Sequence, residues 1–346
     1  MRNQIKTTIR WSNLALIVIT LMAYLSPYIN PNTFWIISIL GLAYPLLLFA
    51  NLGFITLWIS RKKWYFLFSV ACIGLGWNFL SKSVGFNTKS SANPNDISIV
   101  TFNTESAHKF WDYKAKRTDL QKFTTYLQAM DADIICLQEF PIRGELRLKR
   151  DEEWMHSYQA TGKNIVTYSK YPILKHGYFA FVNEYNGCLF TDLKIGEQVL
   201  RVYNVHLSSN KITNIANEVA ENGDWKERET WSKVKQMLLG YRSASKKRAD
   251  QAEEIGKHIA ASPYPVVVCG DFNDVPLSYA YQTIAENLTD HFQARGRGLG
   301  TTFGGSIPFL KIDYILGSPS VAVSTNDILR HDYSDHYPIR SMVSLK

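Results

Sequence analysis

The stretch Val266-Val267-Val268-Cys269-Gly270-Asp271-Phe272-Asn273-Asp274 joins a short apolar run to an abrupt polar ending. The β-branched residues predict a buried strand. Asp271 and Asn273 lie two residues apart, and side chains at that spacing leave a strand on the same side. A carboxylate and an amide placed together suit a hard cation and a water molecule. An Asx turn or a helix cap before Pro276 explains the same two residues equally well.

Other predicted strands on either side of this stretch also end in polar residues. The run 97–102 is followed by Asn103, and the run 134–137 is followed by Gln138 and Glu139. Further strands are expected at 165–168, 188–195, 199–205 and 312–316, and helices at 117–130, 225–241 and 246–261. This mixture predicts an α/β sandwich with functional residues at the strand ends, where loops begin.

Two histidines lie in settings that call for partners. His206 lies inside the apolar strand 199–205 or just after it, where a core histidine bonded to the backbone is the plainer interpretation. Asp335 and His336 are adjacent in a loop that ends at a proline, and neither is expected to be fully buried without a partner. Asp313 lies within a strand and needs a partner as well. We therefore expect Asp313 to orient His336.

Taken in order, these segments resemble the endonuclease/exonuclease/phosphatase superfamily, which has the DNase I-like fold. The resemblance runs from about residue 97 to residue 341 and includes the lesser motif 165–173. Its main motifs are Asn103 after a strand, Leu137-Gln138-Glu139, Asn204-Val205-His206-Leu207, Gly270-Asp271-Phe272-Asn273, Ile312-Asp313-Tyr314 and Ser334-Asp335-His336-Tyr337-Pro338.

The resemblance implies a four-layered α/β sandwich, in which two mixed β-sheets are flanked by helices, and a divalent-metal phosphoesterase site at one edge. Glu139 would be the principal Mg²⁺ ligand, with Asn103 and Asp335 close to the metal. Such a site is physically reasonable, because Mg²⁺ keeps several waters and needs one or two protein carboxylates besides the phosphate oxygens of a substrate. Mn²⁺ is equally compatible.

The same resemblance implies roles for five catalytic residues. Asp271 would activate or position the attacking water, and Asn273 would orient it. His206 and His336 would contact the non-bridging phosphate oxygens, and Asp313 would hold His336. The reaction implied is in-line attack of water at phosphorus.

The charge distribution sets the first 95 residues apart from the rest. They contain eight of the 38 Lys and Arg residues and no Asp or Glu, so 30 basic residues remain to balance the 30 acidic residues that follow. The net charge of +8 therefore belongs to the N-terminal region. A neutral remainder counts mildly against a nuclease that tracks long nucleic-acid backbones.

The N-terminal region is long and apolar enough for several membrane spans. No charged residue lies between Arg10 and Arg61. We expect transmembrane helices at 11–29 and 34–60, and a third at 64–80 that is flanked by aromatic residues. A helix lying in the membrane interface is the alternative for the third run, and a signal peptide is a weaker alternative for the first.

The positions of the basic residues predict the orientation. Arg2, Lys6 and Arg10 precede the first span, and the basic cluster 61–63 follows the second, so the N-terminus is expected in the cytoplasm. With three spans the catalytic domain faces the periplasm or the cell exterior, and with two it faces the cytoplasm. The predicted organisation is a multi-pass region of the inner membrane at 1–86, a linker at 87–95 and a catalytic domain at 96–346.

These features predict a membrane-anchored, Mg²⁺-dependent hydrolase of phosphate esters that prefers phosphodiesters. Nucleic acids and phospholipids are both open as substrates, the lipid bilayer is the partner of the N-terminal helices, and no protein partner is indicated. The alternative is an inactive membrane-tethered module that binds a phosphorylated ligand. No motif residue is missing, which favours the enzyme.

Two further segments bear on the substrate. Lys246, Lys247 and Arg248, or Arg295 with Arg297, could contact a nucleic-acid backbone. The plainer interpretation is that the first group only solvates a helix and that the second lies in a flexible hairpin tip. Apolar residues 231, 234, 238 and 241 form a stripe at helical spacing. That stripe is expected to pack on the sandwich, and the alternative is that it covers the cleft or touches the bilayer.

Overall fold

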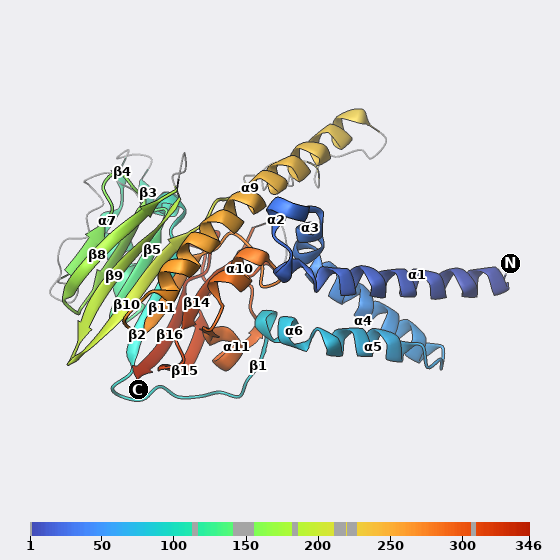
Figure 1. The fold of residues 1–346 in the computed structure, drawn as a ribbon, viewed down its shortest axis with the longest axis horizontal. Coiled ribbons are helices and arrows are strands. Elements are labelled where there is room, and N and C mark those ends of the chain that lie inside the picture. The colour runs from blue at the N-terminus through green and yellow to red at the C-terminus, as the bar shows by residue number, and fades with distance from the viewer. Residues whose placement is uncertain are drawn as a thin grey trace.

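Two six-stranded sheets pack face to face from residue 97 onward (Figure 1). This computed structural model describes residues 2–112, 117–140, 156–181, 186–210, 219, 227–305 and 309–346. The first sheet has the strand order β12 (Thr289–Asp290), β14 (Asp313–Gly317), β11 (Val266–Asp271), β10 (Gln198–His206), β9 (Gly187–Ile195) and β8 (Ile173–Ala180). The second has the order β15 (Val321–Ile328), β16 (Ile339–Leu345), β2 (Ile97–Asn103), β5 (Ile134–Gln138), β7 (Ile165–Ser169) and β6 (His156–Gln159).

Both sheets are mixed. β10 runs parallel to β11 and β2 runs parallel to β5, while the other neighbours are antiparallel. Two short pairs lie outside the sheets, β1 (Val84–Phe86) with β13 (Arg297–Leu299) and β3 (Trp111–Asp112) with β4 (Arg117–Thr118).

The central strands are buried on both faces, which explains their uninterrupted apolar sequences. In β11, Val267 and Cys269 belong to the cluster between the sheets, together with Ile99 of β2. Val266 and Val268 of the same strand belong to a second cluster, on the outer face. The alternation of the strand therefore supplies two core layers from one short run.

Helices cover the outer faces of both sheets (Figure 1). α7 (Leu120–Gln128) packs on the second sheet, and α9 (Arg228–Ala260) and α10 (Tyr279–Ile284) pack on the first. Among the described residues after 96, the other helices are η2 (Glu105–Phe110) and α11 (His291–Arg295). The predicted four-layered α/β sandwich of two mixed sheets flanked by helices is confirmed.

All of the predicted strands are present, but the two predicted helices 225–241 and 246–261 are one. The sequence between them contains no glycine or proline, and Ala244 and Ser245 are buried, so α9 continues without a break. The predicted start at Trp225 lies outside the described residues. The strands that the sequence did not predict, such as β8 and β15, are largely half-buried and carry polar residues on both faces.

The N-terminal region is helical. Its elements are α1 (Arg2–Ala23), η1 (Ser26–Tyr28), α2 (Pro31–Phe34), α3 (Ile36–Leu42), α4 (Tyr44–Ser60), α5 (Phe66–Leu75) and α6 (Trp77–Ser83). By length and composition, one described helix could cross a membrane, at Thr7–Tyr28, and the pair α3 and α4, bent by 60°, could form a second span. The predicted third run is divided into α5, of 10 residues, and α6.

Candidate active site

The carboxyl ends of four central strands meet at one edge of the sandwich. The parallel pairs β2 with β5 and β10 with β11 end there, at Asn103, Gln138, His206 and Asp271. Asp271 also pairs with Asp313 at the start of the antiparallel strand β14. Strand register therefore brings together residues that are far apart in the chain, such as Asn103 and Asp313.

Gly270 allows β11 to reach this edge beside β10. Its φ is +139°, and a Cβ atom at this position would lie 1.9 Å from the carbonyl oxygen of Val205. Only glycine fits such a close approach of two backbones. The Gly-Asp sequence thus has a structural cause in addition to the chemistry of Asp271.

Asn103 links two of the carboxylates. Its Nδ2 donates hydrogen bonds to Oδ2 of Asp271 at 2.9 Å and to Oε1 of Glu139 at 3.3 Å. Its Oδ1 accepts from the backbone N–H of Glu105 at 3.0 Å, which sets the orientation of the amide. Glu139 itself has a φ of +49°, and its side chain is 38% exposed. The Glu139 carboxylate is therefore held by the buried amide of Asn103 on one side and exposed to the cleft on the other.

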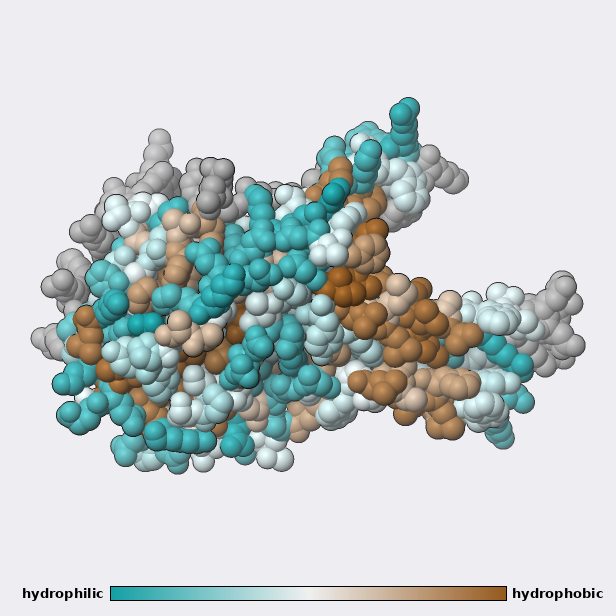
Figure 2. All heavy atoms as spheres, in the orientation of Figure 1, coloured by the Kyte–Doolittle hydropathy of each residue, from teal (hydrophilic) through white to brown (hydrophobic). Residues whose placement is uncertain are grey.

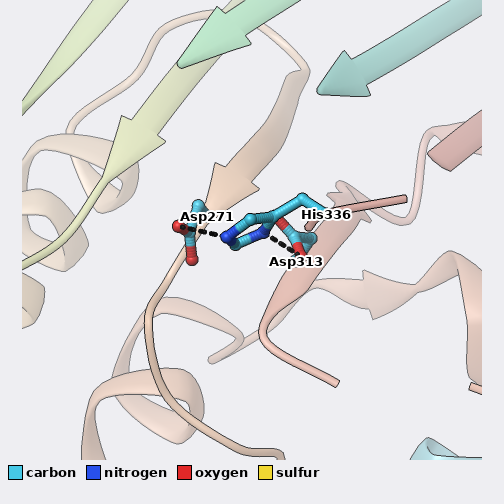
Figure 3. A group of neighbouring side chains, drawn as sticks. All are labelled: Asp271, Asp313 and His336. Carbon is cyan, nitrogen blue, oxygen red and sulfur yellow. Dashed lines mark hydrogen bonds and ion pairs between the residues drawn. The ribbon is translucent and has the colours of Figure 1, made fainter. Parts of the chain in front are cut away.

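Asp313 and Asp271 flank the imidazole of His336 (Figure 3). Nδ1 of His336 lies 3.0 and 3.1 Å from the two carboxylate oxygens of Asp313, and Nε2 lies 3.8 Å from Oδ2 of Asp271. All three side chains are buried. The expectation that Asp313 orients His336 agrees with this geometry.

The surroundings shift the pKa values of Asp271 and His336 upward. Burial raises the pKa of Asp271 to about 6, although the neighbouring His336 opposes the shift. Burial alone would lower the pKa of His336, but Asp313 and Asp271 outweigh it and raise the pKa to about 10. The two carboxylates beside the ring therefore favour the protonated form of His336.

Asn273 fixes the rotamer of Asp271. Its backbone N–H donates to Oδ1 of Asp271 at 2.7 Å, and its Nδ2 donates to Oδ2 at 3.1 Å and to the carbonyl oxygen of Leu207 at 3.0 Å. The positive φ of Asn273, 51°, lets the backbone turn back toward the carboxylate. The hydrogen bond from the backbone N–H of Asn273 to Oδ1 of Asp271 is the Asx turn that was one interpretation of the sequence. The same two residues therefore form the turn and contribute to the candidate site.

His206 does not satisfy Nε2 through the backbone. This atom is buried, has no hydrogen-bond partner among the described residues, and lies 3.6 Å from Oε1 of Glu139 and 3.8 Å from Oδ2 of Asp271. The plainer interpretation of His206 as a satisfied core histidine is therefore not supported. Its ring nitrogen is directed at the acidic cluster.

A cleft opens above these residues. Its polar lining includes Glu139, Asp271, Asn273, Asp335 and His336, which are five of the eight predicted site residues. The other three, Asn103, His206 and Asp313, are buried and contact the lining residues from behind. The structure thus brings the whole predicted set to one place.

Comparison with known proteins identifies the family. Residues 100–336 match the model of the Endonuclease/Exonuclease/phosphatase family. The chain belongs to this family. Residues 6–83 match a second model, described as a domain of unknown function (DUF8431). No curated protein matches the chain.

Solved structures of this family share the fold. Humanised TDP2 of D. rerio has a TM-score of 0.52 at 16% identity, and the match covers 72% of this chain and 99% of that one. A family protein from Bacteroides thetaiotaomicron has a TM-score of 0.51 at 16% identity, covering 73% and 96%. The human Nocturnin catalytic domain has a TM-score of 0.51 at 15% identity, covering 75% and 97%. The sandwich is therefore the phosphoesterase fold of the endonuclease/exonuclease/phosphatase superfamily.

Glu105 also belongs to the candidate site, although no sequence motif was assigned to it. Its carboxylate lines the cleft, and Oε2 accepts from the backbone N–H of Asp335 at 3.2 Å. Burial raises the pKa of Glu105, and the charge of Asp335 raises it further. The sequence contained a pattern that could have indicated Glu105. Asn103 and Glu105 are two residues apart, as Asp271 and Asn273 are, and each pair follows a predicted strand.

Arg248 was expected as a possible contact for a nucleic-acid backbone, and that expectation is wrong. Its side chain is fully buried, with Nε 2.8 Å from Oδ2 of Asp274. One terminal nitrogen donates to the carbonyl oxygen of Ser208 at 3.0 Å and to Oδ1 of Asn210 at 2.7 Å. Because Asn210 and Asp274 both line the cleft, Arg248 supports the site from within the domain.

The described residues include two kinds of candidate metal ligands. Asp271, Asp313 and His336 have ligand atoms within 4.8 Å of one another. The Asp313 carboxylate, however, already accepts from His336, whereas the side chains of Glu139 and Asp335 are 38% and 37% exposed and reach the cleft. Oxygen ligands with room for water are those that Mg²⁺ prefers.

Proposed function

We propose that this chain is a membrane-anchored, Mg²⁺-dependent hydrolase of phosphate esters that prefers phosphodiesters. The observation that carries the proposal is that His336, Asp271 and Glu139 line one cleft, with Asp313 behind His336. A carboxylate of raised pKa beside a histidine whose protonated form is favoured is suited to acid and base chemistry near neutral pH. Family membership supports a phosphoester substrate.

Glu139 and Asp335 would hold the metal ion, with Asn103 beside it. The chemistry of the ligands fits, because both carboxylates reach the cleft and are partly exposed to solvent. Nε2 of His206 has no hydrogen-bond partner among the described residues and lies 3.6 Å from Oε1 of Glu139, so it can serve a group bound beside the metal. Bound Mg²⁺ would neutralise negative charge on the phosphate oxygens. Mn²⁺ suits the same oxygen ligands.

Apart from the metal ligands, the site would contain one general base and two hydrogen-bond donors to the phosphate. Asp271, held by Asn273, would accept the proton of the attacking water at Oδ2. His336 and His206 would donate from Nε2 to phosphate oxygens and stabilise the charge that grows there in the transition state. Asp313 would keep the Nδ1 proton of His336 in place, so that Nε2 points at the substrate.

The surface of the N-terminal helices supports membrane anchoring. Figure 2 shows apolar residues gathered over the helices that extend from the sandwich. Large apolar side chains are exposed along α1, α4 and α5, among them Leu14, Val18, Leu52, Ile59 and Leu67. Polar side chains form hydrogen bonds between the helices: Nε1 of Trp58 on α4 donates to Oδ1 of Asn13 on α1 at 2.8 Å. Outward apolar and inward polar groups are typical of helices in a bilayer.

The position of the basic residues supports a catalytic domain outside the cytoplasm. The N-terminus and the turn between α4 and α5 lie at the end of the helices that is remote from the sandwich (Figure 1). The guanidinium of Arg10 lies 4.6 Å from the ring centroid of Tyr65, next to the cluster 61–63. By the positive-inside rule this end faces the cytoplasm. The sandwich would then face the periplasm or the exterior.

Activity is tested with the full chain in detergent micelles, Mg²⁺ and two substrates, bis(4-nitrophenyl) phosphate and supercoiled plasmid. We expect Glu139→Gln to lower turnover at least 100-fold, while Glu197→Gln, a matched change at an exposed turn, leaves it unchanged. Equal turnover in both variants would contradict the proposal. Absence of turnover, with Mg²⁺-dependent binding of a phosphorylated ligand, would favour the binding module.

Topology is tested separately, by labelling introduced cysteines with a membrane-impermeant maleimide. The four native cysteines are buried, and Ser91 and Lys62 are exposed at opposite ends of the N-terminal region. We expect Ser91→Cys to react in intact cells and Lys62→Cys to react only after permeabilisation. The reverse pattern would place the catalytic domain in the cytoplasm.

A further inference from the structure

The cleft has an apolar side next to its acidic one. Val275, Phe303, Leu310 and Ile312 of the catalytic domain line it, together with Leu42 of the N-terminal region. The chemistry of phosphoryl transfer requires none of these side chains. The apolar side therefore raises the question of which part of a substrate it contacts.

Leu42 is held in the cleft by close packing of α3 on the catalytic domain. A Cβ atom on the preceding residue, Gly41, would lie 2.5 Å from the carbonyl oxygen of Leu277, so glycine is needed for this approach. The hydroxyl of Tyr241 on α9 donates to the carbonyl oxygen of Ser38 on α3 at 2.9 Å, in a buried position. The N-terminal region is thus part of the wall of the candidate active site.

The apolar side continues out of the cleft along α4. Leu46 and Phe49 lie three residues apart on this helix and are 67% and 46% exposed. The ring of Phe49 lies 4.9 Å from that of Phe309, which precedes the cleft residue Leu310 and is 41% exposed. We name the set of Leu42, Leu46, Phe49 and Phe309 the α4 strip. It leads from the candidate catalytic residues to the apolar surface of the N-terminal helices seen in Figure 2.

We propose that the α4 strip binds the alkyl chain of a lipid phosphoester whose phosphate group lies beside Glu139 and His336. The inference rests on the proposed function and names its substrate class. A substrate that is anionic at one end and apolar at the other matches both sides of the cleft, because burial of alkyl surface is favourable. Bases of a nucleic acid can stack on the rings of Phe49 and Phe309, but Leu42 and Leu46 offer no such contact. The buried Arg248 is not available to a nucleic-acid backbone.

The strip also lies on the side of the cleft where such a substrate would arrive. α4 belongs to the helices whose exposed surface is apolar, and its domain-proximal end adjoins α3 and Leu42. A lipid in the surrounding bilayer would therefore reach the cleft by moving along α4, without leaving an apolar environment. Its phosphate would meet the catalytic residues at the surface of the bilayer.

The test compares phosphodiesters that differ only in chain length. Ethyl, octyl and tetradecyl 4-nitrophenyl phosphate are given to the full chain in non-ionic detergent micelles with Mg²⁺, at a fixed mole fraction of substrate. We expect kcat/KM to rise at least tenfold from the ethyl to the tetradecyl ester. In Leu42→Asn and in Leu46→Asn, the ratio of tetradecyl to ethyl kcat/KM should fall at least fivefold.

Leu67→Asn is the matched control, because Leu67 is an exposed leucine on α5 that does not line the cleft. Long-chain esters partition into micelles equally in every variant, and this control shows that effect alone. Leu67→Asn should therefore keep the ratio of tetradecyl to ethyl kcat/KM that the native chain has. Leu46 is exposed, so its variant provides the comparison even if Leu42→Asn fails to fold. A ratio that is the same in all three variants would overturn the inference. So would faster turnover of supercoiled plasmid than of the tetradecyl ester, since that result favours a nucleic acid.

Binding without turnover separates this inference from the proposed function. Isothermal titration calorimetry with tetradecyl phosphate and ethyl phosphate should show at least tenfold tighter binding of the long-chain compound, and Leu42→Asn should remove the difference. If no ester is hydrolysed but this preference is found, the proposed function fails and the alkyl-binding strip stands. Equal binding of the two compounds would overturn the strip whether or not the protein is an enzyme.

Discussion

The surroundings of two buried histidines, His336 and His291, shift their pKa values in opposite directions. Burial and the carboxylates of Asp313 and Asp271 leave His336 with a pKa of about 10. His291 is equally buried, but its two ring nitrogens have no hydrogen-bond partner among the described residues, and burial lowers its pKa to about 4 against the opposing charge of Asp290. The charge of a histidine therefore depends on whether a carboxylate accepts from its ring.

The contact between Asp313 and His336 gives a prediction for activity. Asp313→Asn should lower kcat on bis(4-nitrophenyl) phosphate by roughly 100-fold or more, because an amide no longer stabilises the imidazolium or its tautomer. The pH profile of kcat should also lose its alkaline plateau, since His336 would deprotonate at lower pH. Asp327→Asn, at an exposed position of β15, is the control. A loss of less than threefold would show that His336 acts without Asp313.

His291 gives a prediction for stability against pH. Its pKa is about 4 in the folded chain and 6.5 for the unperturbed side chain, so the unfolded state takes up the proton first as pH falls. The stabilising contribution is thus complete above pH 6.5 and is lost between pH 6.5 and 4, with about 2 kcal/mol lost between pH 7 and 5.

Guanidinium unfolding of the native chain and of His291→Phe at pH 7 and pH 5 measures this contribution. The phenylalanine variant should lose about 2 kcal/mol less stability over that interval. His176→Asn, at an exposed histidine away from the candidate site, should behave as the native chain does. An identical pH dependence in His291→Phe would show that another group causes the acid sensitivity.

At the scale of elements, the long helix α9 contacts the first sheet, the loop after β11 and the N-terminal helix α3. Its C-terminal half packs on the first sheet, and Arg248 binds the loop after β11 through Asp274. Its N-terminal half projects beyond the sandwich (Figure 1), and Trp231 and Leu238 are 56% and 39% exposed. The expectation that this stripe packs on the sandwich is therefore wrong for these two residues. Tyr241 of the same stripe is buried against α3.

The buried ion pair of Arg248 and Asp274 predicts a large cost for a single substitution. Arg248→Met should lower the free energy of unfolding by about 3 to 5 kcal/mol, because it leaves the Asp274 carboxylate buried without a partner. The double variant with Asp274→Leu should recover part of this loss, since no buried charge then remains. Denaturant unfolding measures both. An equal loss in the single and double variants would show that packing, and not the ion pair, dominates.

At the scale of the whole molecule, the N-terminal region is joined to the catalytic domain by specific contacts. Nδ2 of Asn30 donates to Glu253 at 2.9 Å, Nζ of Lys311 donates to the carbonyl oxygen of Lys82 at 3.0 Å, and β1 pairs with β13. A buried cluster also contains apolar residues of both parts. The predicted linker 87–95 therefore follows a region that is already docked on the domain.

Removal of residues 1–86 should consequently weaken the catalytic domain. The fragment would expose Val275, Leu277, Leu310 and Ile312, which are buried in the full chain. We expect its Tm to lie roughly 10 °C below that of the full chain, with concentration-dependent aggregation. Differential scanning fluorimetry and light scattering measure both, with a chain that lacks only residues 2–9 as the control. A monomeric fragment of unchanged Tm would show that the docking contributes little.

The class of fold could be predicted from the sequence, and the family resemblance indicated eight residues of the candidate site but not Glu105. Apolar runs such as 97–102 and 266–268 could be assigned as strands because they are buried on both faces, and the polar residues that end them are conspicuous. Strand β15 could not be assigned in this way, because it is half-buried and its polar residues hide the period of two. The unbroken helix α9 depended on burial of residues 244 and 245, which a sequence does not reveal.

The arrangement of these residues and their surroundings depend on the tertiary fold. The pairing of Asp271 with Asp313, the exposure of Glu139, the burial of Arg248 and the place of Leu42 in the cleft all depend on contacts between distant segments. Local propensity records which backbone conformation a residue favours, but not which distant side chain lies beside it. The chemistry could be anticipated from residue types at strand ends, whereas charge state, solvent access and the apolar side of the cleft arise from packing.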